Sequence, residues 1–171
     1  MLPNDCKLKR LSLKYNMLFI TFKLGEANYA LEARQVIEVV PLVTLRACSG
    51  APAYIAGLAN YRGTGVPIVD LGRLVGGVPC AIYLSTRIIL THYEGKGGQQ
   101  RVIGLLAETV TNTVERAETD FSQSDLVGSG TSCFGKLAVS GTGFIQRIVI
   151  ARMLPKELEQ MLFADPEAPA L

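Results

Sequence analysis

Residues 51–71, APAYIAGLANYRGTGVPIVDL, constrain the fold most, because glycines and prolines interrupt short apolar runs there. The runs 54–59 and 66–69 predict two short strands, with an Arg-Gly-Thr-Gly corner at residues 62–65 between them. Glycine allows the positive φ that a tight corner needs, and proline lacks a backbone donor, so the second strand should be an edge strand or kinked. The residues expected to shape this turn region are Gly57, Gly63, Gly65 and Pro67.

Arg62 is the one charged residue of this stretch before Asp70, and it comes directly before the corner. We expect its side chain to point away from the core. An arginine held on a rigid turn suits docking, because its planar fork binds carboxylates or carbonyls with defined geometry. The alternative is an ordinary solvated arginine in a surface turn.

Composition bounds the class of protein. With 171 residues, 49% hydrophobic and 19% charged, the chain can form one domain with a sizeable core, or two small subdomains that share one. A net charge of +2 disfavours nucleic-acid binding, which needs a basic face. No apolar run approaches the ~20 residues that span a bilayer. The four cysteines lack CxxC spacing and predict reduced thiols rather than a metal or redox site: Cys6, Cys48, Cys80 and Cys133.

Strand periodicity dominates the rest of the chain. Residues 17–24 alternate apolar and polar side chains and should form a hairpin with the strand after the turn at 25–28. Short helices are expected at 70–74, capped by Asp70, and at 155–163. Nine or ten short strands without βαβ alternation predict a barrel or sandwich, not a nucleotide-binding sheet. Later strands are expected at 87–93, 102–107, 108–114, 134–139 and 144–150.

The chain ends differ from this pattern. Residues 1–16 are basic and lack hydrophobic periodicity, so we expect a flexible extension. Residues 164–171 contain two prolines and should form a tail. The folded domain is therefore expected to occupy residues 17–163.

No group of residues in the sequence has the pattern of a catalytic site. His92 is the single histidine, and no nucleophile elbow accompanies it. Asp120 and Asp125 lack the spacing of a calcium loop. We therefore expect a protein without catalytic residues, metal ligands or cofactor.

The central stretch resembles the signature of the CheW-like family, the coupling proteins of bacterial chemosensory arrays. The resemblance extends over 17–163 and includes LFITFKLGEANYALEARQVIEVV and RVIGLLAETVTNTV. The signature residues in register are Pro52, Tyr54, Ile55, Gly57, Asn60, Arg62, Gly63, Val66, Pro67, Asp70 and Leu71.

The resemblance implies a mainly β fold of two small five-stranded, SH3-like barrels around a shared core. The first barrel would take most of 17–85, the second most of 86–150, and the terminal helix would cross back. The implied function is a non-catalytic adaptor between the cytoplasmic tips of chemoreceptors and the regulatory domain of a CheA-type histidine kinase. It would act in the cytoplasm at membrane-associated receptor clusters and could self-associate in rings, without nucleic-acid binding or membrane insertion.

Binding residues carry over position by position. The resemblance assigns a receptor-facing groove to Arg62, Val36 and Glu38, with Ile88 and Leu90 as an apolar wall. It assigns kinase contact to Leu42, Val43 and Leu45.

Two positions depart from the family pattern: Tyr61 stands where many members have leucine, and Arg147 places a charge in the last strand. The segments PLVTLRA, STRIILTHY and LPKELEQMLF are similar to coupling proteins of Wsp-type surface-sensing systems. Three alternatives stay open. The first is a module of the same fold with altered partners, either like CheV-like proteins or in a cyclic-di-GMP or biofilm pathway. The second is a small β-barrel enzyme, and the third is a nucleic-acid-binding barrel.

Overall fold

The computed structural model describes residues 16–95, 98–122, 133–141 and 143–163. The expected tail and all of the expected extension except Asn16 lie outside these residues. The strands are β1 (Asn16–Leu24), β2 (Ala27–Glu32), β3 (Val36–Pro41), β4 (Ile55–Tyr61), β5 (Thr64–Asp70), β6 (Arg87–Glu94), β7 (Gln100–Ala117), β8 (Phe121–Ser122), β9 (Phe134–Ser140) and β10 (Gly143–Ile148). The helices are α2 (Leu71–Gly76) and α3 (Lys156–Leu162), with short 3-10 turns η2 (Ala33–Gln35), η3 (Glu118–Asp120) and η4 (Ile150–Arg152).

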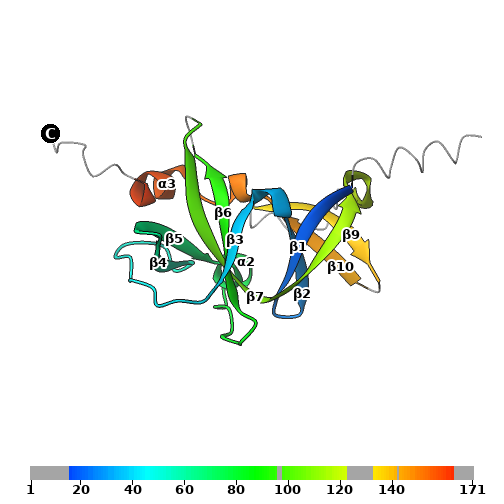
Figure 1. Ribbon diagram of the computed structural model, residues 1–171, viewed down its shortest axis with the longest axis horizontal. Coiled ribbons are helices and arrows are strands. Elements are labelled where there is room, and N and C mark those ends of the chain that lie inside the picture. Colours follow the sequence, from blue (N-terminus) through cyan, green and yellow to red (C-terminus); the bar gives the residue numbers. More distant parts are fainter. Residues whose placement is uncertain (1–15, 96–97, 123–132, 142, 164–171) are drawn as a thin grey trace, which may run out of the picture.

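The strands form two β units that lie side by side, with β7 passing from one to the other (Figure 1). The central β unit contains β3, β4, β5, β6 and the first half of β7. The terminal β unit contains β1, β2, β8, β9, β10 and the second half of β7. The pairings therefore differ from the expected division at residue 85, because the chain leaves the terminal unit after β2 and returns to it only along β7.

Strand β7 replaces two expected strands, 102–107 and 108–114. Residues 100–107 pair with β6, and the part from Glu108 to Ala117 pairs with β1. Thr109, the second residue of the part that pairs with β1, has a φ of 46°. A left-handed residue bends a strand, and the β1–β7 register shifts at this place, so one continuous strand can serve both units.

The larger core belongs mostly to the central unit, in which β5 and β6 are covered on both faces. Residues 88–90 of β6 are at most 1% exposed, and residues 66–70 of β5 are all buried. Continuous apolar burial of this kind is typical of strands inside a packed layer. A smaller core in the terminal unit contains Phe19, Ala30, Phe121, Ala138 and Ile145.

Pro67 occupies a position where its missing donor costs no ladder bond to β7. It pairs with Leu58 of β4, whereas β5 meets β7 only from Ile68 to Asp70. Strand β5 as a whole is thus not an edge strand, although it has a single partner strand at Pro67.

The two expected helices are present. The Asp70 carboxylate accepts a hydrogen bond from the Arg73 backbone N–H at 3.2 Å, which caps α2, and Gly77 ends this helix with a φ of 72°. Pro155 directly precedes α3, and Leu158 on the apolar face of this helix is buried.

Candidate functional site

The turn between β4 and β5 is tighter than the expected four-residue corner. Arg62 and Gly63 are its two central residues, with φ values of 52° and 83°, and Tyr61 pairs with Thr64. Two consecutive positive φ values define a type I′ hairpin turn. The Asn60 side-chain oxygen accepts a hydrogen bond from the Gly63 N–H at 2.9 Å. Because left-handed backbone is unfavourable for a residue with a Cβ, the position of Arg62 carries strain of about 1–2 kcal/mol.

Arg62 takes part in a cluster that links this turn to β3. The Tyr61 hydroxyl donates a hydrogen bond to Glu38 Oε2 at 2.7 Å, and Arg62 Nη2 lies 3.5 Å from the same oxygen. The guanidinium carbon of Arg62 lies 5.0 Å from the centre of the Tyr61 ring. The hydrogen bond to Glu38 raises the pKa of Tyr61. We call these three residues the Glu38–Tyr61–Arg62 cluster, and it offers both a cation and a carboxylate to solvent.

The cluster brings together two of the five expected receptor-facing residues. The side chains of Arg62 and Glu38 are 77% and 44% exposed. Val36, the first residue of β3, is half-buried and packs against the large core. Ile88 and Leu90 are 0% and 1% exposed and cannot form an apolar wall. Residues 88–91 of their strand are all buried, so side chains on both of its faces are covered.

The three expected kinase-facing residues follow β3 in the segment that leads to β4. Val43 is 45% exposed, whereas Leu42 and Leu45 are half-buried and pack against the large core. A bridge anchors this segment, because Arg46 and Leu58 exchange two backbone hydrogen bonds of 2.8 Å each. Val43 is therefore the member that is available for contact.

Gly57 is not a turn residue, which corrects the expectation. It lies within β4 with a φ of +146°, and a Cβ there would be 2.5 Å from the Arg46 carbonyl oxygen. It permits the close approach of the anchored segment. Gly65 also lies within a strand, β5, and has open space around its Cα, so Gly63 alone of the three glycines forms the turn.

An apolar surface that the sequence analysis missed lies on the loop of residues 77–86. We call it the apolar loop. The sequence signal was the run Ile82-Tyr83-Leu84, which follows Pro79 without polar alternation. Beside it is a groove of 440 Å³, lined in part by Tyr29, Val75 and Glu108. The large side chains exposed on the loop are Val78 (68%), Ile82 (67%), Tyr83 (59%) and Leu84 (97%).

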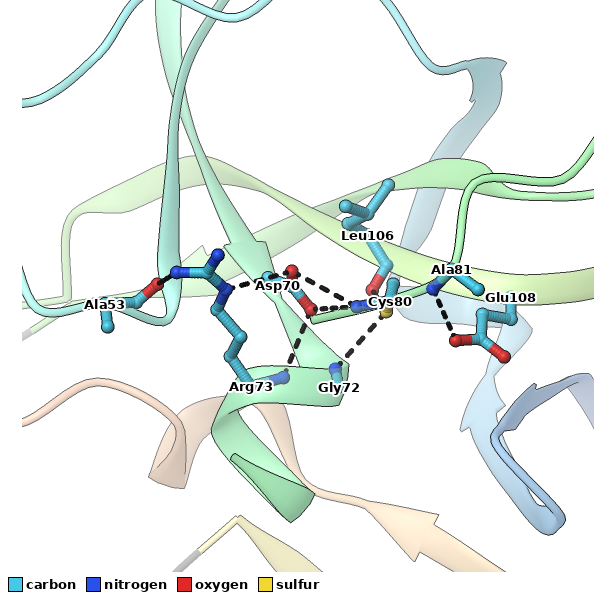
Figure 2. A network of polar contacts seen from close by, with 8 residues as sticks. All are labelled: Ala53, Asp70, Gly72, Arg73, Cys80, Ala81, Leu106 and Glu108. Carbon is cyan, nitrogen blue, oxygen red and sulfur yellow. Dashed lines mark hydrogen bonds and ion pairs between the residues drawn. The ribbon is translucent and has the colours of Figure 1, made fainter. Parts of the chain in front are cut away.

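A buried polar network holds the apolar loop in place (Figure 2). The Cys80 N–H donates to Asp70, with distances of 3.1 and 3.3 Å to the two carboxylate oxygens. The Ala81 N–H donates to Glu108 Oε1 at 2.7 Å. The Cys80 thiol accepts from the Gly72 N–H at 3.3 Å and donates to the Leu106 carbonyl at 3.4 Å. Burial raises the pKa of Cys80 to about 12, so its thiol is a neutral structural group.

The other described residues considered for catalysis or metal binding do not come together in a site. His92 is exposed on β6. Within the described parts of the chain, no three histidine, cysteine, aspartate or glutamate side chains gather as metal ligands. The helices formed by those same residues are too short and too polar to span a bilayer.

The likeness to known proteins covers most of the chain. Chemotaxis protein CheW of Treponema pallidum is 24% identical over 150 residues, which are 83% of this chain and 85% of the relative. Chemotaxis protein CheW of Rhizobium meliloti is 26% identical over 125 residues, 71% of this chain and 77% of the relative. Protein FrzA of Myxococcus xanthus is 28% identical over 92 residues, 54% of either chain.

The fold is also similar to a solved structure. The crystal structure of scaffolding protein TtCheW from Thermoanaerobacter tengcongensis matches with a TM-score of 0.75 and 24% identity, covering 86% of this chain and 93% of that one. The family described as CheW-like domain matches residues 18–154, from β1 to beyond η4. The chain therefore belongs to the CheW-like domain family.

Proposed function

We propose that this CheW-like coupling protein joins the cytoplasmic tips of chemoreceptors to the regulatory domain of a CheA-type histidine kinase, without catalysis of its own. The observation that carries the proposal is the presentation of Arg62. Its side chain is 77% exposed on a strained two-residue turn, where a hydrogen bond from Gly63 to Asn60 fixes the backbone. Strain that persists at an exposed position favours a binding role over a purely structural one.

The receptor face would centre on the Glu38–Tyr61–Arg62 cluster and the exposed side of β3. Receptor tips are helical in this family, and an amphipathic helix docks through apolar anchors with charges at their rim. Arg62 can hold a carboxylate of such a helix with two parallel hydrogen bonds. Glu38 pairs with Leu90 and Val40 with Ile88, so the half-buried Val40 lies on the same face of β3 as Glu38 and can supply apolar contact there. Val36 pairs with Thr91 on the other face, and Ile88 and Leu90 support β3 from the core.

The kinase face would lie on the segment after β3. Val43 is its exposed side chain, and Leu42 and Leu45 hold the segment against the core. An isolated valine gives little binding energy, so neighbouring residues of the same segment must contribute. Self-association in rings would use exposed surfaces of the two β units.

The place of action and the output are parts of the proposal. The protein would work in the cytoplasm at membrane-associated receptor clusters. The segments PLVTLRA, STRIILTHY and LPKELEQMLF favour a surface-sensing pathway of the Wsp type over flagellar control. Deletion of the gene would then change surface-dependent cyclic-di-GMP levels more than swimming bias.

The test is a pair of binding titrations, with a receptor cytoplasmic fragment and with a kinase regulatory domain from the same operon. Arg62→Glu should weaken receptor binding at least about tenfold and leave kinase binding unchanged, because a charge reversal removes a charge-assisted contact. Val43→Asp should show the reverse pattern. Lys23→Glu, at an exposed position on β1, is the matched charge-reversal control. A wild-type protein that binds neither fragment would overturn the proposed function.

A further inference from the structure

We propose that Tyr61 is a positioning residue for receptor binding. Its hydroxyl donates a hydrogen bond to the Glu38 carboxylate and thereby keeps the Arg62 guanidinium available to a partner. This inference rests on the proposed function and assigns a role to a residue that departs from the usual leucine of the family. It starts from the unequal distances within the Glu38–Tyr61–Arg62 cluster.

Tyr61 is fixed by the fold. It is the last residue of β4, pairs with Thr64 across the turn, and its half-buried ring packs against the large core. Its hydroxyl therefore has a defined place near β3. The distance of 2.7 Å to Glu38 Oε2 is the optimum for a hydroxyl donor.

Arg62 is the weaker partner of the same oxygen. Its Nη2 lies 3.5 Å from Glu38 Oε2, beyond the 2.7–2.9 Å that is typical of a charge-assisted pair. The guanidinium instead lies over the Tyr61 ring, 5.0 Å from its centre. The edge of the guanidinium, which carries the N–H donors, thus stays accessible, and the Tyr61 ring supports its face.

The two roles of Tyr61 can be separated chemically. The ring supports the guanidinium by a cation–π contact, and the hydroxyl engages the carboxylate. With leucine at position 61 both would be lost, and Glu38 would be left to pair with Arg62 directly. A direct pair would neutralise the cation before a partner arrives.

The geometry also describes the partner. Arg62 requires an acceptor, ideally a carboxylate, and the 44%-exposed Glu38 beside it favours a neighbouring donor. A receptor helix that suits this cluster carries an acidic side chain with an amide or lysine about one turn away. A helix that offers apolar contacts alone would gain nothing from Tyr61.

The experiment compares wild type with Tyr61→Phe, which keeps the ring and removes the hydroxyl. Titration with the receptor cytoplasmic fragment should show binding weakened by about 3- to 10-fold, the worth of one hydrogen bond, with kinase binding unchanged. Tyr83→Phe, which removes a hydroxyl from an exposed tyrosine of the apolar loop, is the matched control. A crystal structure of unbound Tyr61→Phe should show the Arg62–Glu38 distance shortened from 3.5 Å to about 2.9 Å.

The outcomes separate the two proposals. If wild type binds the receptor fragment but Tyr61→Phe binds equally well, or keeps the long Arg62–Glu38 distance, the role of Tyr61 is wrong and the proposed function stands. If wild type fails to bind, the proposed function falls and this inference falls with it.

Discussion

Arg147 on β10 forms an ion pair with the buried carboxylate of Glu32 on β2. It also lies 2.8 Å from Glu118, and its guanidinium carbon is 5.7 Å from the Phe19 ring centre and 6.0 Å from that of Phe121. Burial lowers the pKa of Arg147. The charge that departs from the family pattern in the last strand is thus the counter-ion of a buried acid, and it covers the smaller core.

Arg147→Met should destabilise the protein by about 1–3 kcal/mol, because it removes one of the two arginines that pair with buried Glu32 and leaves only Arg34. Urea unfolding at pH 7 measures the change. Lys136→Met is the control, since Lys136 forms an exposed pair with Glu118, and it should cost less than about 1 kcal/mol. Adding Glu32→Leu to Arg147→Met should recover part of the loss, and a double variant less stable than Arg147→Met would contradict this account.

Arg62→Asn should increase the free energy of unfolding by about 0.5–1 kcal/mol, because asparagine tolerates left-handed backbone and Asn-Gly is the preferred pair in this turn. The same variant should lose receptor binding. Thermal unfolding and the receptor titration together check the prediction. A variant that is both less stable and binding-competent would show that the strain at Arg62 has no link to function.

Gly57→Ala should cost about 1–3 kcal/mol, because its φ of +146° and the Arg46 carbonyl at 2.5 Å both exclude a Cβ. The segment that carries Val43 should move, since the Arg46–Leu58 bridge must open. Amide hydrogen exchange should therefore rise at Arg46 and Leu58. Gly65→Ala, with open space around its Cα, is the matched control and should leave that exchange unchanged.

The buried thiols predict a loss of stability at alkaline pH. Burial raises the pKa of Cys80 from 9.0 to about 12 and that of Cys133 to about 11. Between pH 9 and these values the unfolded state releases thiol protons that the folded state retains. Stability is therefore complete below pH 9 and falls as pH rises, by up to about 1.4 kcal/mol per pH unit for each thiol.

The measurement is the urea midpoint at intervals from pH 8 to 11, for wild type and Cys80→Ser. The serine hydroxyl does not titrate in this range, so the variant should show a shallower decline above pH 9. Equal slopes for the two proteins would refute the assignment to Cys80.

The sequence predicted the features that neighbouring residues determine. The β1–β2 hairpin follows from alternation and a turn, and the α2 cap follows from Asp70 three residues before its donor. The Tyr61–Glu38 hydrogen bond joins residues 23 positions apart, and no local pattern specifies it. Ile88 and Leu90 were expected in a receptor-facing groove because of the family resemblance, and neither that resemblance nor the alternation along 87–93 reveals that β6 is covered on both sides.

The continuity of β7 was missed for a related reason. Glu108 and Thr109 look like the start of a new strand, because their polarity interrupts an apolar run. In the fold they are the crossing point of one strand, with Glu108 bonded to the N–H groups of Gly25 and Ala81. Contacts that distant in sequence decide which units a strand serves.

The continuity of β7 also limits how the protein can be taken apart. The 18-residue β7 lies between β5 and β6 in the central unit and pairs with β1 in the terminal unit, so a cut anywhere in Gln100–Ala117 removes part of the ladder from at least one unit. Expression of either half alone should give an incomplete sheet with an open edge, which is prone to aggregation. Split reporters and inserted tags therefore belong outside this segment, because the two β units share β7 and cannot be separated as independent pieces.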